Sequence, residues 1–419
     1  NEGKDTRKIL DELLDEVFAK GLLLGQGGET TSIFGEYDVT EIFGEVSIPL
    51  LEDAEFAENL TLELGGRYSD YSTSGGEPTY KVAVDWSINE DWKVRASYNR
   101  AVRAPNVGEL FSPQSNGLWG GSDPCAGANP VQTAAQCANS GVTASQYGNI
   151  TASPASQYNG VFGGNPDLQP EIADTVSIGV VANPFENFNF SVDYWDIQLE
   201  EVIGTVGAEL TVEQCGLTGD AAYCDNVTRS GAGSLWLGTA GNVKATNVNL
   251  ANRHWGGVDI SANYVLEALG GTFTSSLIGT YMLDKEFEQL PGFPDATFDC
   301  VGNIDNGCFA QPEWRHTAKV SFDMDTFWTA SIHWRYYGEV SYSESADELI
   351  GSGIGAQSYI DMKAAFDVTD NVGILVGMNN VLDKEPPMVG GTLSTNGNAI
   401  VGFYDTLGRY MHASVTVKF

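Results

Sequence analysis

The feature that most constrains this chain is an alternation of apolar and polar residues with a period of two, which recurs along most of its length. In residues 79–88, Val82, Val84 and Trp86 fall on one face, and the pattern resumes after a turn at 89–91. Because successive side chains of a β-strand point to opposite faces, this segment predicts a hairpin with one apolar and one charged face.

The same alternation predicts about 13 strands of roughly ten residues each. They are expected at 41–50, 59–71, 79–88, 92–101, 172–183, 187–202, 254–266, 272–284, 314–323, 328–339, 357–367, 371–381 and 408–419.

The predicted connections between these strands alternate between short and long. Short ones are expected near 51–58, 89–91, 184–186, 267–271, 324–327 and 368–370, and long ones near 72–78, 102–171, 203–253, 285–313, 340–356 and 382–407. Structureless loops of such length argue against a compact soluble domain. Short turns at one end and long loops at the other are what an outer-membrane β-barrel requires.

Other features agree with a membrane barrel. No run of about 18 apolar residues exists, which excludes a helical span. Aromatic residues stand near strand ends, where membrane interfaces place them; they are Trp86, Trp92, Tyr194, Trp328 and Tyr336. The alternatives are a soluble β-sandwich, whose loops are seldom this long, and a propeller, whose repeat of 40 to 50 residues is not found. We therefore predict an all-β fold, a transmembrane antiparallel barrel.

The charge balance restricts the partners. The chain has 21 Lys and Arg against 56 Asp and Glu, which gives a net charge of −35. A nucleic-acid backbone needs a cationic surface, so nucleic acid is excluded as a partner.

The six cysteines form three close pairs, each within a long connection. The pairs are Cys125 with Cys137, Cys215 with Cys224, and Cys300 with Cys308. An even number of paired cysteines predicts three local disulfides and an oxidising compartment. Free thiols or a metal site are the alternatives, but no second ligand pair or histidine lies near any pair.

Strand direction leads to a further expectation. Residues 5–24 carry the pattern of one amphipathic helix, and Phe419 ends the last strand, which follows a long loop. Strict alternation places the C-terminus in the periplasm and residues 1–40 in an extracellular segment. A complete single-chain barrel has an even number of strands. We therefore expect residues 41–419 to be the C-terminal portion of a larger barrel.

Four segments resemble those of TonB-dependent outer-membrane receptors. They are the run from Arg100 to Phe111, which includes Arg103-Ala104-Pro105-Asn106, the run from Asn165 to Glu171, the run from Asn379 to Lys384, and the terminal Phe419. The resemblance covers residues 33–419. It implies a 22-stranded barrel with an N-terminal plug, of which the plug and about nine strands have no counterpart in this chain.

The resemblance also implies a function. We expect energised uptake of a scarce nutrient across the bacterial outer membrane, with a TonB-type coupling protein acting through the plug. The partners would be the plug and remaining barrel portion, and outer-membrane lipid. Phe419 fits an assembly signal for barrel insertion, or a lipid-facing anchor. A passive porin, an adhesin-type barrel and a surface structural protein are the alternatives.

Ligand chemistry is expected from the long connections, which are rich in aromatic and amide side chains. Candidate contacts are Trp119, Tyr147, Tyr158, Phe162, Trp236 and Trp255. Aromatic faces with amide donors suit sugars, peptides or neutral planar ligands. The scarcity of basic residues disfavours an anionic ferric chelate, so we expect an oligosaccharide or a peptide, with a metal chelate as the second candidate. The alternative is that these rings pack the loops together.

Arg103 is a further candidate contact, with pairing to loop carboxylates as its alternative role. The four histidines are scattered and form no catalytic motif. We therefore predict no enzyme activity, no catalytic residue, no cofactor and no metal site.

Overall fold

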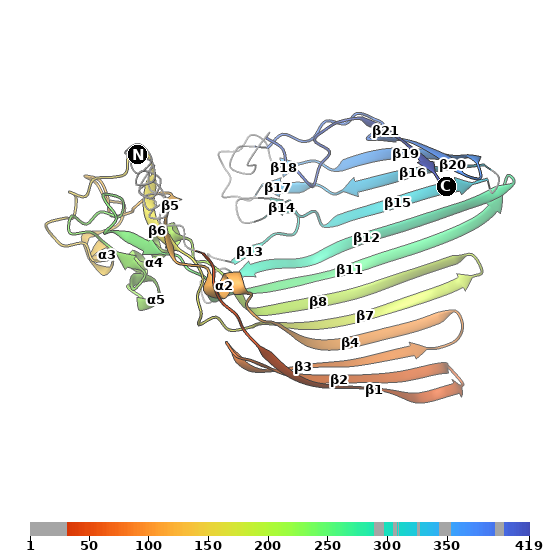
Figure 1. Cartoon of the computed structure of the whole chain (residues 1–419), viewed down its shortest axis with the longest axis horizontal. Helices are drawn as coiled ribbons and strands as arrows, with labels where there is room; N and C mark the ends of the chain where they lie inside the picture. Colours follow the sequence, from red (N-terminus) through yellow and green to blue (C-terminus); the bar gives the residue numbers. More distant parts are fainter. Residues whose placement is uncertain are drawn as a thin grey trace, which may run out of the picture.

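The computed structural model describes residues 32–288, 297–304, 308, 310–324, 327–342, 353–389 and 398–419. Within them, the main element is a 14-stranded sheet with exclusively antiparallel pairing (Figure 1). Thirteen of its strands follow one another in chain order, and β13 (Thr297–Asp299) pairs with β12 alone. The predicted barrel strands are therefore confirmed in number and order. The predicted helix at residues 5–24 lies outside the described residues.

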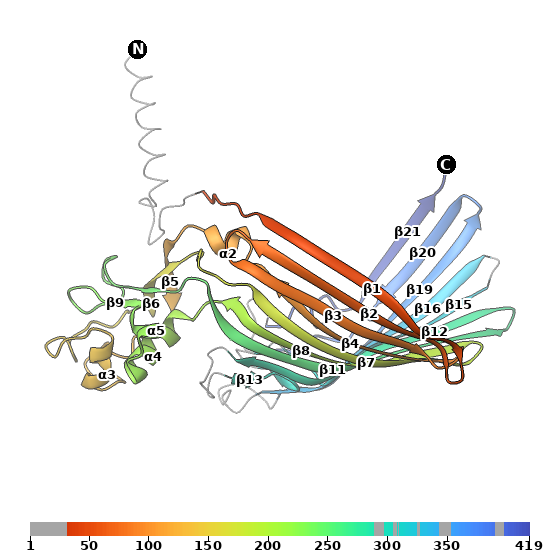
Figure 2. The same ribbon diagram turned by 90° about the horizontal axis from the view of Figure 1, so that it is seen from below.

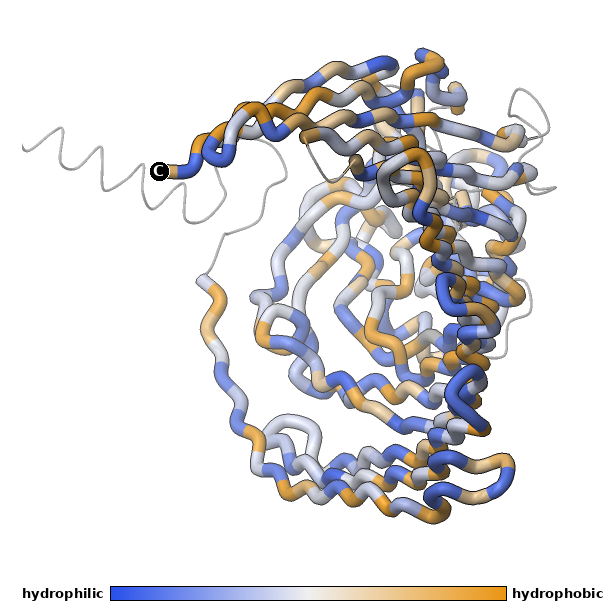
Figure 3. The backbone as a smooth tube through the Cα atoms, turned by 90° about the vertical axis from the view of Figure 1, so that its right-hand side faces the viewer, coloured by the Kyte–Doolittle hydropathy of each residue, from blue (hydrophilic) through white to orange (hydrophobic). Residues whose placement is uncertain are grey.

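Of the thirteen consecutive strands, those in the first two-thirds of the chain are longer than the sequence predicts. They are β1 (Val39–Ala54), β2 (Ala57–Tyr71), β3 (Gly75–Ser87), β4 (Trp92–Arg103), β7 (Glu171–Phe185), β8 (Phe188–Gly204), β11 (Val248–Ala268), β12 (Gly271–Glu288), β15 (Trp314–Asp323), β16 (Trp328–Tyr337), β19 (Gln357–Thr369), β20 (Val372–Asn379) and β21 (Tyr410–Val417). Seen along the strands, the sheet curls into an open arc (Figure 3), as the right-handed twist of strands favours. Its two edges are β1 and β21.

The tightest connections gather at one end of the sheet, which we call the turn end (Figure 1). Only two residues join β1 to β2, β7 to β8, β11 to β12, and β19 to β20. Between β11 and β12, Leu269 and Gly270 both have positive φ, of 58° and 77°. Two such residues are what a two-residue hairpin needs to match the twist of its strands.

Two predicted boundaries are wrong. The connection expected at 72–78 has only three residues, because β2 continues to Tyr71 and β3 starts at Gly75. The connection expected at 184–186 lies at 186–187, because the strand continues to Phe185 through a register shift after Ala182. Proline lacks the N–H that a regular ladder needs, so such an irregularity is where a strand tolerates it.

The two faces of the sheet differ as the alternation predicts. The apolar face carries large side chains that this chain leaves uncovered, such as Ile178 (53% exposed) and Ile332 (49%). The opposite, polar face carries ion pairs that join Lys81 to Glu63 (2.8 Å), Lys93 to Asp85 (2.7 Å) and Arg95 to Asp193 (2.8 Å). An apolar surface of this extent needs an apolar environment.

The long connections are not structureless, contrary to the sequence prediction. They contain the helices α2 (Val107–Phe111), α3 (Ala134–Asn139), α4 (Ala208–Thr218) and α5 (Ala221–Cys224). They also contain β5 (Ser115–Gly120), β6 (Gln157–Phe162), β9 (Val227–Thr228) and β10 (Asn242–Lys244), which form a four-stranded sheet, and β14 (Asn303–Ile304), β17 (Val340–Tyr342) and β18 (Gly353–Ile354), which form a three-stranded one. Among the described residues, no helix is long and apolar enough to cross a membrane.

Candidate functional site

The connections between β4 and β7 and between β8 and β11 fold together into one body, which we call the loop subdomain (residues 104–170 and 205–247). It lies beyond the strand ends opposite the turn end, at what we call the loop end (Figure 2). The two connections are joined by parallel pairing of β6 with β10, in which Gly160 stands opposite Val243. Its largest apolar cluster consists of Trp119, Tyr158, Ala208, Val212, Leu235, Val243 and Ala245.

A buried ion pair also links the two connections. Arg229 donates to Asp123 at 2.7 Å, and the two side chains are only 3% and 1% exposed. The same guanidinium donates to the carbonyl of Gly233 (2.9 Å) and to the hydroxyl of Ser140 (3.1 Å). A buried charge that loses its partner is strongly destabilising. The pair therefore ties the first connection to the second.

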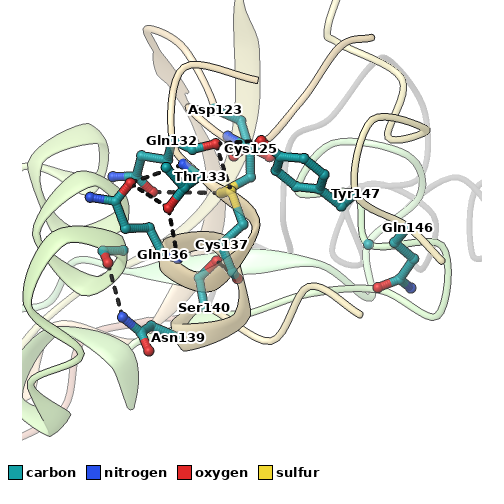
Figure 4. The surroundings of a disulfide bond; sticks show 12 residues. Asp123, Cys125, Gln132, Thr133, Gln136, Cys137, Asn139, Ser140, Gln146 and Tyr147 are labelled. Atoms are coloured by element: carbon teal, nitrogen blue, oxygen red, sulfur yellow. Dashed lines mark hydrogen bonds between the residues drawn. A yellow bond between two sulfur atoms is a disulfide. The ribbon is translucent and has the colours of Figure 1, made fainter. Parts of the chain in front are cut away.

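The three predicted disulfides are confirmed, and two of them lie in the loop subdomain. Cys125–Cys137 joins a turn at Pro124 and Cys125 to α3 (Figure 4). This helix begins at Thr133, whose side chain accepts from the backbone N–H of Gln136, and the Gln136 side chain in turn accepts from the N–H of Thr133. This capping box satisfies two N–H groups that a helix start leaves unpaired.

Most of the aromatic residues predicted to contact a ligand lie inside the loop subdomain. Trp119 and Tyr158 are 7% and 3% exposed and stack on each other at 4.7 Å between ring centroids. Phe162 and Trp236 pack against the same cluster, and Trp236 donates its indole N–H to the carbonyl of Thr151 at 2.8 Å. These rings hold the loops together, which is the alternative role that the sequence left open.

The remaining predicted contacts lie apart from that cluster. Tyr147 packs beside the Cys125–Cys137 disulfide and donates to the carbonyl of Gln132 at 3.0 Å. Trp255 lies on β11, on the polar face of the large sheet by its register opposite Lys285. Phe419 follows β21 at the turn end.

Arg103 ends β4 and is held by two carboxylates. Its guanidinium donates to Glu171 at 2.6 Å and to Glu109 at 3.0 Å. The structure therefore gives Arg103 the carboxylate partners that the sequence named as its alternative.

Basic residues on the polar face, near the loop end, were missed by the sequence analysis. Arg253, Lys285 and Arg315, which we call the basic rim, have no carboxylate within 4 Å among the described residues. The Arg253 guanidinium lies 5.1 Å and the Lys285 ammonium 6.0 Å from the ring centroid of Phe287, and Trp255 packs on the same ring. They could have been found from the sequence, because each occupies a polar position of the alternating pattern close to the point where a strand meets a long connection.

Two cavities meet at Arg253. One of 580 Å³ lies between the strand ends and α4, and includes Glu209 and Glu213. The other, of 460 Å³, includes His254, Glu286 and Glu288. Cavities of this size at the loop end can admit a small ligand or part of a larger one.

A second apolar core, which we call the rim cluster, lies under the C-terminal connections. It consists of Ile304, Ala310, Val340, Ile354, Tyr359, Val389, Ile400 and Tyr404. Beside it, Arg335 donates to Asp361 (2.9 Å) and Asp405 (2.6 Å) and stacks over the Tyr359 ring at 5.1 Å. Burial raises the pKa of Tyr404 to about 12, so its phenol stays neutral at physiological pH.

In the part of the chain that the structure describes, no three His, Cys, Asp or Glu side chains come together as a metal-binding group.

The fold and its loops define a class of protein. Long antiparallel strands with one apolar and one polar face, tight turns at one end and elaborated loops at the other are the features of an outer-membrane-type β-barrel. The family model described as TonB dependent receptor-like, beta-barrel matches residues 17–381, and the chain belongs to this family. The resemblance seen in the sequence is thereby confirmed.

Solved structures agree with this fold. The chain is similar to a mutant of the ferric enterobactin receptor from Pseudomonas aeruginosa (TM-score 0.59, 14% identity, covering 94% of this chain and 46% of that one). It is also similar to the siderophore receptor PirA from Acinetobacter baumannii (0.56, 15%, 91% and 46%) and to the FrpB iron transporter from Neisseria meningitidis (0.51, 14%, 91% and 44%).

The chain thus spans about half the length of the solved structures that it matches. A comparison with curated protein sequences gave no match.

Proposed function

We propose that this chain is the C-terminal portion of the barrel of a receptor that imports a scarce nutrient across the bacterial outer membrane, driven by a TonB-type protein. Membership of the TonB-dependent receptor family is the observation that carries the proposal. The loop end would then face the outside and the turn end, with the C-terminus, the periplasm. No covalent chemistry is needed in this function.

The open arc supports a larger assembly. Among the residues that the structure describes, strands β1 and β21 each have only one neighbour in the sheet. Unpaired backbone groups in lipid cost several kcal/mol each, so a barrel closes its edges. Further strands, and a plug between them that contacts the polar face, would complete the receptor. These parts are the partners that we propose, together with the energy-coupling protein and membrane lipid.

A ferric chelate is the substrate class that we favour. The similar solved structures include receptors for ferric enterobactin and other siderophores. The basic rim supplies cations without carboxylate partners beside the rings of Trp255 and Phe287, which suits an anionic ligand with aromatic groups. An oligosaccharide or a peptide is the second candidate, because the loop subdomain itself contains only two basic residues, Arg229 and Lys244.

Uptake by intact cells tests both the mechanism and the substrate. We would express the full-length receptor in a host bacterium that has an outer membrane but lacks its own iron receptors. The cells would be offered iron-55-labelled ferric enterobactin or labelled maltohexaose. We expect uptake of the ferric chelate that stops when a protonophore removes the energy source. Uptake that continues without energy would contradict TonB coupling and favour a passive porin. Uptake of maltohexaose alone would replace the chelate by an oligosaccharide.

A variant pair sharpens the assignment of the basic rim. Replacing Arg253 and Lys285 by glutamine removes two cations beside Phe287. We expect the affinity for ferric enterobactin to fall at least about tenfold, since each lost charged contact is worth about one to three kcal/mol. The matched control is Arg95→Gln, because Arg95 is also on the polar face but is neutralised by Asp193. An equal loss in both variants would contradict a specific role of the basic rim.

A further inference from the structure

Four stretches of chain pass between the large sheet and the loop subdomain. They follow β4, precede β7, follow β8 and precede β11. None of the residues in the apolar clusters of the loop subdomain belongs to the large sheet. Its own core therefore does not fix how the loop subdomain stands on the strands, and another set of contacts has to do so.

An ionic contact joins three of the four crossings. Arg103, at the end of β4, lies between Glu109 in α2 and Glu171 at the start of β7. Glu171 also accepts from the backbone N–H of Ile203, near the end of β8, at 2.8 Å. A guanidinium presents several donors in one plane, so it can hold two carboxylates at once.

Glu109 is itself fixed by local structure. Asn106 caps α2 by accepting from the N–H of Glu109, and the Glu109 carboxylate accepts from the N–H of Asn106. Both residues belong to the segment after Arg103 that the sequence marked as a family feature. The capping box thus holds the carboxylate in the position where Arg103 meets it.

Asparagine side chains connect the fourth crossing to the others. Asn247 donates to the carbonyl of Glu109 at 3.2 Å, and Asn165 donates to the carbonyl of Asn247 at 3.0 Å. Asn249 exchanges two hydrogen bonds of 2.8 Å with the backbone of Gln169 and donates to the carbonyl of Glu201 at 2.8 Å. Each amide bonds backbone on a chain stretch other than its own.

We propose that these residues form a clamp that fixes the orientation of the loop subdomain over the loop end of the polar face, with Arg103 as its central positioning residue. The clamp consists of Arg103, Asn106, Glu109, Asn165, Glu171, Asn247 and Asn249. The effect on ligand binding rests on the proposed function, whereas the effect on orientation does not.

Distances between spin labels test the orientation directly. All six cysteines are paired in disulfides, so introduced cysteines can be labelled selectively. In the full-length receptor in outer-membrane vesicles, one label replaces Val131 in the loop subdomain (91% exposed) and the other replaces Leu382 next to β20 (69% exposed). Double electron–electron resonance then gives the distribution of the distance between them.

We expect Arg103→Gln to at least double the width of this distribution, and Arg103→Lys to broaden it as well, because an ammonium cannot hold both carboxylates in the same geometry. Arg95→Gln, the matched control, should leave it unchanged. Labels on Val131 and Leu237, both inside the loop subdomain, should keep their distribution in every variant. An unchanged Val131–Leu382 distribution in both Arg103 variants would overturn the clamp. Equal broadening within the loop subdomain would also overturn it, since Arg103 would then support folding rather than orientation.

Binding of iron-55-labelled ferric enterobactin to energy-depleted cells tests the functional effect. We expect Arg103→Gln to raise the dissociation constant about tenfold without changing the number of sites, since one charged contact is worth about this factor. Equal affinity in the variant and the wild type would contradict positioning of the ligand site. If the wild type itself does not bind the chelate, the substrate proposal fails, while the distance measurement still decides on the clamp.

Discussion

The loop subdomain and the rim cluster lie at the same end of the sheet but differ in whether their cores include residues of its strands. The core of the loop subdomain comes entirely from the two long connections, and it is reinforced by two disulfides and a buried ion pair. The rim cluster includes Tyr359 of β19 and has Tyr337 of β16 packed against it. The first therefore has an apolar core of its own, whereas the core of the second is shared with strand β19 of the sheet. A destabilising substitution in the loop subdomain should therefore lower the stability of that subdomain alone. One in the rim cluster should also lower the stability of the large sheet.

The largest effect is expected from Tyr359→Ala. Tyr359 is fully buried in the rim cluster, and truncating a buried aromatic ring leaves a cavity that costs about 4 kcal/mol. Because Tyr359 belongs to β19, the barrel itself should lose stability. The measurement is gel electrophoresis after heating the sample to increasing temperatures, in which the compact, fast-migrating form should disappear at a lower temperature than in the wild type. Tyr359→Phe, which keeps the ring, should retain most of the stability. A barrel as stable as the wild type in Tyr359→Ala would mean that the rim cluster is also a separate unit.

Arg229→Leu should destabilise the loop subdomain alone, by about 3 kcal/mol, because it leaves the Asp123 carboxylate buried without its partner. Pulse proteolysis across a urea series would locate the change in residues 104–170 and 205–247. Adding Asp123→Leu should recover much of the loss, since both charges are then absent. If the compact form of the barrel became less heat-stable as well, the separation of the two regions would be contradicted.

Removal of Cys125–Cys137 by paired serine substitutions should cost the loop subdomain about 2 to 3 kcal/mol, as expected for a crosslink that closes a loop of this length. The same proteolysis measures the loss. Paired serine substitutions at Cys300 and Cys308 are the matched control, because that disulfide lies in a different connection. An equal effect of both removals on the loop subdomain would argue against a self-contained unit.

The smallest effect is expected from Thr133→Ala. It removes the cap of α3, which is worth about 1 kcal/mol. Thr133→Ser keeps a hydroxyl acceptor and should behave as the wild type. A loss of several kcal/mol would show that α3 supports much more of the loop subdomain than its six residues indicate.

The strands were predictable because their constraint is local. A strand between apolar and polar surroundings must alternate, so β3 and β4 could be found from Lys81, Val82 and their neighbours alone. Turn positions were less certain, as at Pro184, because a strand can absorb an irregular residue by a register shift that leaves no mark in the alternation. The disulfide pairs were also predictable, since each closes within one connection.

The loop subdomain was beyond sequence reasoning because its contacts join distant segments. From the sequence, Trp119 and Tyr158 are equally compatible with a sugar-binding surface and with a buried core. Only the packing of Leu235 and Val243 beside them shows that they are buried. The basic rim was missed for a related reason. Arg253 and Lys285 are far apart in sequence and come together beside Phe287 only through the register of β11 and β12.

The pairing of β6 with β10 also dictates an order of events during export. The hairpin of β7 and β8 lies between these two strands in the sequence. They therefore cannot pair until residue 244 has crossed the inner membrane. Cys125–Cys137 and Cys215–Cys224 each close over a short stretch, and short loops close fastest. The disulfide Cys125–Cys137 can therefore form in the first connection of the loop subdomain while the second connection is still being delivered.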